Sequence, residues 1–174
     1  MAADPVVDEI AELVGWTGTV DADPAWRAVE AELDVVLPVD FKALMTRFPT
    51  GWFAGFLEVY SPLVVPGGTS ALLAEVSDMR DLLAEQPHLP FPAEELLPWG
   101  GGFDGHSLFW HTNSADPASW PVLFCEASFT TWGSYPGTAT GFLRAVLTGE
   151  FTHPVFADQL HGDRAVFVPA DPNP

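Results

Sequence analysis

The sequence predicts a single α+β domain, in which several helices pack on a central antiparallel β-sheet. Its 174 residues are 48% hydrophobic and 13% aromatic, enough to bury a core without disulfides or metals. Apolar residues recur with the helical period through most of the chain up to about residue 85. From residue 93 onward the pattern changes to the period of two that is typical of strands.

The first half of the chain predicts four helices, over residues 5–14, 24–33, 39–48 and 70–85. Gly15 is expected to end the first, and Asp23 is expected to cap the second, with Pro24 at its first position. A turn at 66–68 leads to Thr69 or Ser70, either of which suits the N-cap of the fourth. The second and third helices are joined so briefly that we expect them to pack as neighbours.

The helix over 39–48 has the clearest boundaries of the four. Pro38 suits its first turn, and Asp40 brings a carboxylate to the positive end of the helix. Pro49 and Gly51 are expected to end it, and a strand is expected over 56–60. Its apolar face consists of Phe41, Leu44, Met45 and Phe48.

The second half predicts an antiparallel meander with strands over 96–100, 106–111, 120–126 and 130–135. Asp104-Gly105 is a strong hairpin turn between the first two. A last helix is expected to begin after Thr138 or Thr140 and to end before Gly149. A late strand is expected over 166–168, and residues 171–174 are expected to fray.

The charge is strongly acidic, because 24 Asp and Glu residues face six Lys and Arg, for a net charge of −18. A field of this sign repels nucleic acid and anionic lipid and attracts a basic partner. Solubility alone is the alternative interpretation. The sequence has no apolar run of membrane-spanning length, no secretory signal at its start and one cysteine, Cys125. We therefore expect a cytoplasmic protein with no membrane partner.

Patterns for catalysis, metals or cofactors are missing from the sequence. The histidines form no metal-binding pair, and His106 and His111 are expected on opposite sides of a strand. Cys125 is interpreted as a buried structural thiol beside an acidic neighbour. The glycine-rich residues 100–105 lack the lysine of a phosphate-binding loop and are interpreted as a hairpin. We expect no metal and no cofactor.

Several motifs in a fixed order resemble the SUKH superfamily, whose eukaryotic members include yeast cell-wall regulators of the Smi and Knr type. They are Trp26-x-x-Val29-Glu30 with Leu33, Leu37-Pro38-x-Asp40-Phe41-Lys42-x-Leu44, Phe48-Pro49-x-Gly51, Leu97-Pro98-Trp99-Gly100, the strand from Gly105 to Trp110, Trp120-Pro121-Val122, and Tyr135 before Phe142-Leu143. The resemblance covers residues 16–150. An acidic helical extension over 1–15 and a partly irregular extension over 151–174 are expected to flank it.

The resemblance implies helices packed on an antiparallel sheet. It also implies an immunity protein, since bacterial members mostly bind and neutralise a toxin, often a nuclease. The family has no catalytic residues, and its toxin-binding surface varies among members, so no binding residue is transferred to this chain.

We therefore expect a non-enzymatic immunity-type protein that binds a toxin with a basic surface. The candidate contacts are an acidic strip on the outer side of the helix over 70–85 and the hairpin turn: Glu75, Asp78, Asp81, Glu85 and Asp104. Ordinary solvated surface is the alternative for each. A general interaction module of the Smi and Knr type without a toxin is the alternative function, and an enzyme that uses His106 or Cys125 is a third. The oligomeric state is not predicted.

Overall fold

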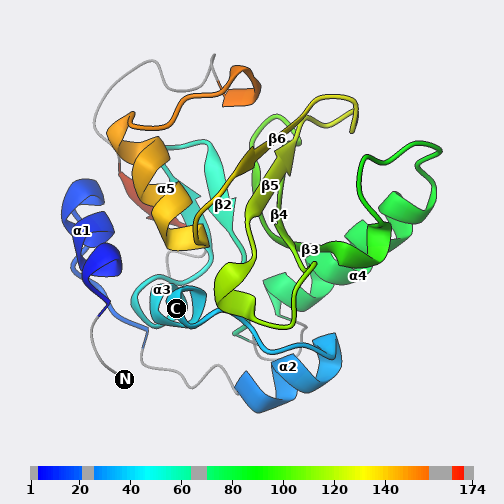
Figure 1. Cartoon of the computed structure of the whole chain (residues 1–174). Coiled ribbons are helices and arrows are strands. Elements are labelled where there is room, and N and C mark those ends of the chain that lie inside the picture. The colour runs from blue at the N-terminus through cyan, green and yellow to red at the C-terminus, as the bar shows by residue number, and fades with distance from the viewer. Residues whose placement is uncertain (1–3, 21–25, 64–69, 157–165, 171–174) are drawn as a thin grey trace.

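Among the residues that the structure describes, the sheet has seven strands in the order β6-β5-β4-β3-β2-β1-β7, and every neighbouring pair is antiparallel. Figure 1 shows the computed structural model, which describes residues 4–20, 26–63, 70–156 and 166–170. The strands are β1 (Gly51–Phe53), β2 (Leu57–Val59), β3 (Leu96–Gly102), β4 (Ser107–His111), β5 (Val122–Cys125), β6 (Trp132–Tyr135) and β7 (Phe167–Pro169). The helices are α1 (Pro5–Val14), α2 (Trp26–Leu33), α3 (Val39–Arg47), α4 (Ala71–Ala84) and α5 (Ala139–Thr148). The predicted α+β class and the predicted meander, from β3 to β6, are confirmed.

Helices lie on both sides of the sheet. On one side, α1, α3 and α5 pack on one another and bury a large aromatic cluster against the strands. On the other side, α4 packs on β3 and covers a second, smaller cluster that includes Phe109, Leu123 and Cys125. Figure 1 shows α1 and α5 on one side of the strands and α4 on the opposite side.

Local sequence signals explain most helix ends. The Asp4 side chain accepts a hydrogen bond from the Val6 N–H at 2.9 Å, and Gly15 ends α1 in the left-handed region at φ 67°. Ser70 and Thr138 cap α4 and α5 through their hydroxyl oxygens. Asp23, Pro24, Thr69, the turn at 66–68 and residues 171–174 lie outside the described residues.

Residues of the motif Trp26-x-x-Val29-Glu30 connect α2 to α3. One carboxylate oxygen of Glu30 accepts the Leu37 N–H at 2.8 Å, and the same carboxylate pairs with Lys42. The Lys42 ammonium also lies 5.7 Å from the centre of the Trp26 ring. These contacts link α2 to α3 through polar side chains across their short connection.

Gly51 does not end α3, contrary to the prediction. The helix ends at Arg47, and Phe48 already has extended backbone angles of φ −122° and ψ 129°. Gly51 is instead the first residue of β1, where an added Cβ would lie 2.6 Å from the Val168 carbonyl oxygen and 2.5 Å from the Phe167 ring. A glycine is needed here because β7 passes close to it.

The strand β1 itself was not predicted. Ala54 and Gly55 turn the chain with φ values of 52° and 74°, so that β2 returns antiparallel to β1. Three residues are too few for an alternation pattern to be visible in the sequence. The other neighbour of β1 is β7, the late strand that the sequence does predict.

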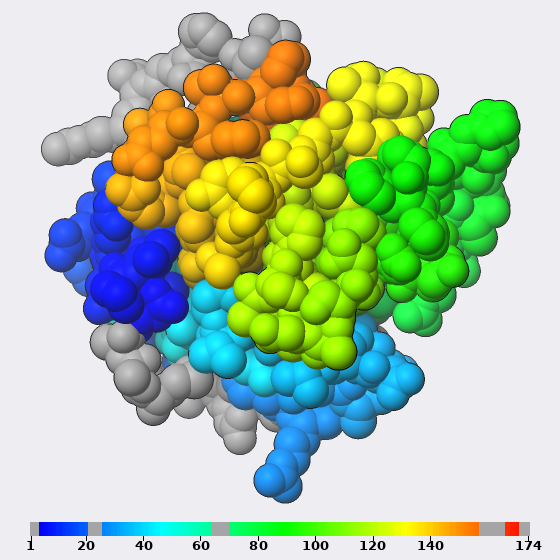
Figure 2. Space-filling view, viewed as in Figure 1, coloured from blue at the N-terminus to red at the C-terminus, as the bar shows by residue number. Residues whose placement is uncertain are grey.

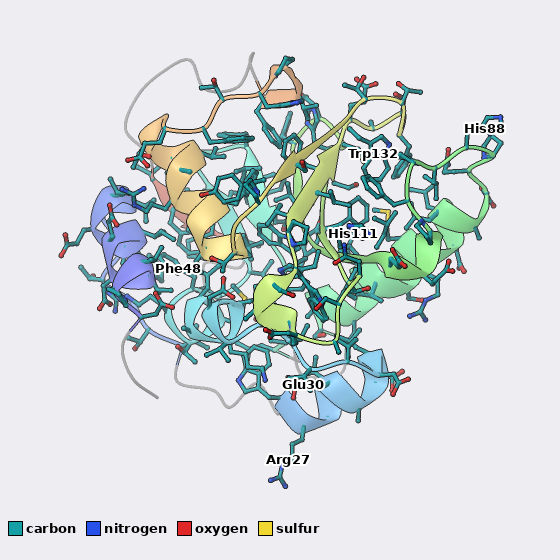
Figure 3. The ribbon with its side chains drawn as sticks, in the orientation of Figure 1. Arg27, Glu30, Phe48, His88, His111 and Trp132 are labelled. Carbon is teal, nitrogen blue, oxygen red and sulfur yellow. The ribbon has the colours of Figure 1, made fainter. Side chains whose placement is uncertain are left out.

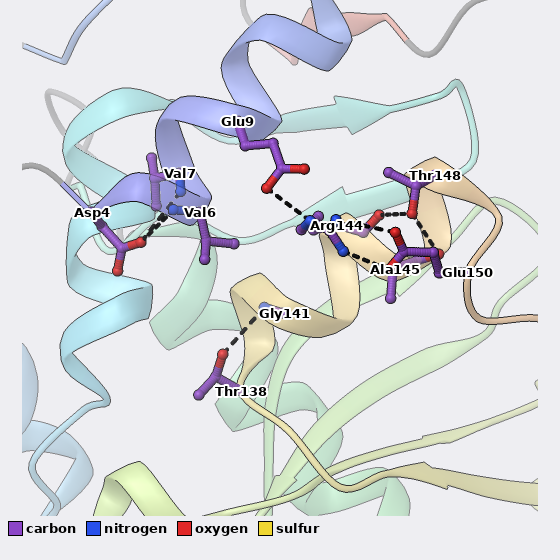
Figure 4. A network of polar contacts seen from close by, with 10 residues as sticks. All are labelled: Asp4, Val6, Val7, Glu9, Thr138, Gly141, Arg144, Ala145, Thr148 and Glu150. Carbon is purple, nitrogen blue, oxygen red and sulfur yellow. Dashed lines mark hydrogen bonds and ion pairs between the residues drawn. The ribbon is translucent and has the colours of Figure 1, made fainter.

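Both predicted extensions join the fold. α1 packs on α3 and α5, where Val7 and Ile10 are buried, and β7 forms one edge of the sheet. Arg144 of α5 pairs with Glu9 of α1 at 2.8 Å and with Glu150 at 2.6 Å, which ties α1 to α5 (Figure 4). The family boundaries at residues 16 and 150 stay a prediction.

Candidate protein-binding surface

The side of the sheet that carries α4 contains a row of cross-strand partners, one from each of the seven strands described. Cross-strand pairing connects Val168, Trp52, Glu58, Gly101, Ser107, Cys125 and Trp132. Ser107 and Cys125 are buried, while Glu58 and Trp52 are half-buried and Val168 is exposed. The row therefore runs from the region of the sheet that α4 covers to a region that is accessible to solvent.

Two carboxylates meet where the covered part ends. Burial raises the pKa of Glu58 on β2, and the Glu75 carboxylate on α4 raises it further. Burial likewise raises the pKa of Glu75, with a further contribution from Asp78. The shifts have this direction because burial and like charges both disfavour ionisation. Glu58, Glu75 and Asp78 thus form one cluster of mutually repelling charges.

Tyr60 lies beside this cluster. A Cβ added to Gly101 would meet the Tyr60 hydroxyl oxygen at 2.5 Å, so the phenol extends over that glycine. Burial raises the pKa of the Tyr60 hydroxyl well above its usual range, and Glu75 and Glu58 add to this effect. The hydroxyl stays protonated and is a hydrogen-bond donor next to two carboxylates.

The predicted acidic strip is only partly on the outer side of α4. Asp78, Asp81 and Glu85 are exposed, but Glu75 is half-buried and interacts with Glu58 and Tyr60. Asp104 is exposed on a different element, the turn between β3 and β4, where Gly105 takes a φ of 80°. In Figure 2, α4 and the segment after it form a ridge along one side of the molecule.

Three of the basic side chains that the structure describes bind partners away from the Glu58 cluster. Lys42, Arg47 and Arg144 each bind an acidic side chain or a carbonyl oxygen. Arg27 is exposed and points away from α2 (Figure 3), and Arg80 is exposed on α4. Throughout the described ranges, no ion pair involves the carboxylates of the Glu58 cluster.

The residues considered for catalysis lie buried in the sheet or pack against aromatic side chains. Cys125 is buried, as predicted, and burial raises the pKa of its thiol to about 12, with a smaller contribution from Glu126 in the same direction. His106 lies against Phe156 in the large cluster, whereas His111 lies against Phe91 and bonds Glu95 at 2.9 Å on the other side. Their predicted opposite orientation is confirmed.

Within the part of the chain that the structure describes, no group of three His, Cys, Asp or Glu side chains is arranged to hold a metal. The helices described there include none long and apolar enough to cross a membrane.

Sequence reasoning missed Glu58 and Tyr60 as site residues, although it placed both on a strand. The signal was available in the alternation of Leu57-Glu58-Val59, which buries the two aliphatic residues and sends Glu58 to the opposite side. The sequence does not show that Glu75 lies near Glu58, because this proximity depends on how α4 crosses the sheet.

No family model matches the chain, and neither a curated protein nor a solved structure matches it. The resemblance to the SUKH superfamily therefore stays a prediction from the motifs.

Proposed function

We propose that this chain is a non-enzymatic immunity-type protein that binds and neutralises a toxin with a basic surface. The observation that supports this most directly is the acidic cluster of Glu58, Glu75 and Asp78. Beyond the effect of burial, Glu75 raises the pKa of Glu58 and Asp78 raises the pKa of Glu75, and no described cation forms an ion pair with the three carboxylates. Such a cluster is stabilised most by a partner of opposite charge.

The net charge supports the same proposal. An enzyme that cleaves nucleic acid needs a basic cleft to grip phosphates, and an acidic protein can occupy that cleft. A net charge of −18 would also steer such a partner and raise the association rate by roughly 10 to 1,000-fold at low salt. The proposal locates the chain in the cytoplasm, where a nuclease toxin would meet its substrate.

The environment of Cys125 supports binding over catalysis. A buried thiol with a pKa of about 12 is a poor nucleophile at neutral pH.

The test first looks for a toxin domain encoded beside this gene and co-expresses it with this chain. The two purified proteins are then titrated at low and high salt. We expect rescue of growth and a complex that weakens as salt rises. Glu75→Lys should lower the affinity about tenfold or more, because it reverses a charge within the cluster. Glu32→Lys, at an exposed position on α2, makes the same change of net charge elsewhere and should have a smaller effect.

Failure to form a complex at low salt would overturn the proposal. A complex with a partner that has no toxic activity would favour a general interaction module of the Smi and Knr type.

A further inference from the structure

The accessible part of the α4 side of the sheet exposes large apolar side chains. Phe103 is 75% exposed, Val168 52% and Val166 46%. The Trp52 ring lies beside them, with its centroid 6.3 Å from that of Phe103 and the two planes at 68°. We call Trp52, Phe103, Val166 and Val168 the open sheet surface.

Backbone pairing holds these side chains in place. Trp52 pairs with Val168 across β1 and β7, and the Ala54 N–H donates to the Val166 carbonyl at 2.8 Å. The Phe103 N–H donates to the Phe56 carbonyl at 3.0 Å, which joins the hairpin turn to β2. The open sheet surface therefore belongs to the ordered sheet.

The core does not require these residues to be apolar. Phe53 and Phe167, which alternate with Trp52 and Val168, already supply the ring contacts on the opposite side, 4.7 Å apart. An exposed cluster containing Trp and Phe marks an interaction site more often than a plain surface.

Acidic groups border the open sheet surface on one side. Glu58 is the cross-strand neighbour of Trp52, and Glu75 interacts with Glu58 from α4. A partner that matches this arrangement has an apolar centre beside lysine or arginine side chains.

Building on the proposed function, we infer that the open sheet surface is where the basic partner docks. In this arrangement, apolar side chains of the partner cover Trp52 and Phe103, and cationic side chains of the partner approach Glu58 and Glu75. A second copy of the chain fits poorly, because it would bring another net charge of −18 to the same place.

The test uses a synthetic peptide of alternating Lys and Leu, added to the isotope-labelled full chain and followed by NMR. Control peptides alternate Lys with Ser and Glu with Leu. We expect the Lys-Leu peptide to shift the indole N–H signal of Trp52 and the amide signals of Phe103 and Glu58. Phe103→Ser and Val168→Ser should each weaken this binding about tenfold. Val39→Ser should not, because Val39 is 72% exposed on α3 at the other side of the sheet.

Equal binding of the Lys-Ser peptide, shifts elsewhere, or unchanged affinity of Phe103→Ser and Val168→Ser would overturn the inference. Sedimentation that shows a dimer dissociated by Phe103→Ser would also overturn it, since the occupant would then be a second copy. Circular dichroism checks that each variant is folded. Because no toxin is used, a failed toxin complex alongside binding of the Lys-Leu peptide at Trp52 would reject the immunity proposal and leave the docking surface standing.

Discussion

The Asp40 carboxylate accepts hydrogen bonds from Thr140, which lies one hundred positions later in the chain. One carboxylate oxygen accepts the Thr140 backbone N–H at 3.1 Å and the Thr140 hydroxyl at 3.0 Å. Asp40 lies in the first turn of α3, and Thr140 lies in the first turn of α5. A single negative charge therefore lies at the positive N-terminal ends of two helices.

Asp40→Ala should lower the free energy of unfolding by about 2 kcal/mol, because it removes two hydrogen bonds to a charged acceptor. Thr140→Val keeps the backbone bond and loses only the hydroxyl bond, so we expect about 1 kcal/mol. Urea unfolding of both variants and of the double variant measures the coupling between them. Strictly additive losses would mean that the two side chains do not interact in solution.

Phe41→Ala should cost roughly 3–5 kcal/mol, since truncating a fully buried aromatic ring leaves a cavity. The Phe41 ring is completely buried and stands edge-on to Trp110 at 4.8 Å. The exposed Val39 on the same helix is the control, and Val39→Ala should change stability by less than about 0.5 kcal/mol. A loss below about 1 kcal/mol for Phe41→Ala would contradict the buried face of α3.

Stability should fall as pH rises through the range in which Glu58 and Glu75 ionise. Their pKa values are raised in the folded state, so between the ordinary value of 4.5 and the raised values the folded chain holds more protons than the unfolded chain. The cost of ionisation is fully present above that range and absent below it.

Glu75→Gln removes this cost, and it should stabilise the protein near neutral pH by less than about 1 kcal/mol, because both side chains are half-exposed and solvent screens them. The gain should vanish near about pH 3, where the carboxyl groups are protonated in either state. Thermal unfolding of Glu75→Gln and of Asp81→Asn, an exposed control, tests this. A gain that is equal at both pH values would rule out titration as its cause.

Glu126 should titrate far below an ordinary glutamate. Hydroxyl groups of Thr130, Thr131 and Ser128 donate to its carboxylate and lower its pKa to about 2. Its contribution to stability is present above pH 4.5 and is lost as pH falls toward 2. Carboxyl NMR titration measures this pKa, and Thr131→Val should raise it. An unchanged pKa in Thr131→Val would show that this hydroxyl does not bind the carboxylate.

Elements whose signals lie close together in the chain could be predicted from the amino-acid sequence. The stop at Gly15 and the turn at Asp104-Gly105 act within a few residues of themselves, so residue types alone predict them. The caps of α4 and α5 were predicted as Thr69 or Ser70 and as Thr138 or Thr140, and the structure selects Ser70 and Thr138. The buried face of α3 follows from its period in the same way.

Contacts between residues far apart in the chain could not be predicted from the sequence, because they depend on how the elements pack together. β1 depends on pairing with β7, more than one hundred residues away, and Gly51 is needed for that close approach rather than for ending α3. Glu75 belongs by sequence to an outer acidic strip, yet the path of α4 brings it to Glu58. The helical period fixes the direction in which a side chain points from the axis of its helix. What that side chain faces depends on how the helix packs on the sheet.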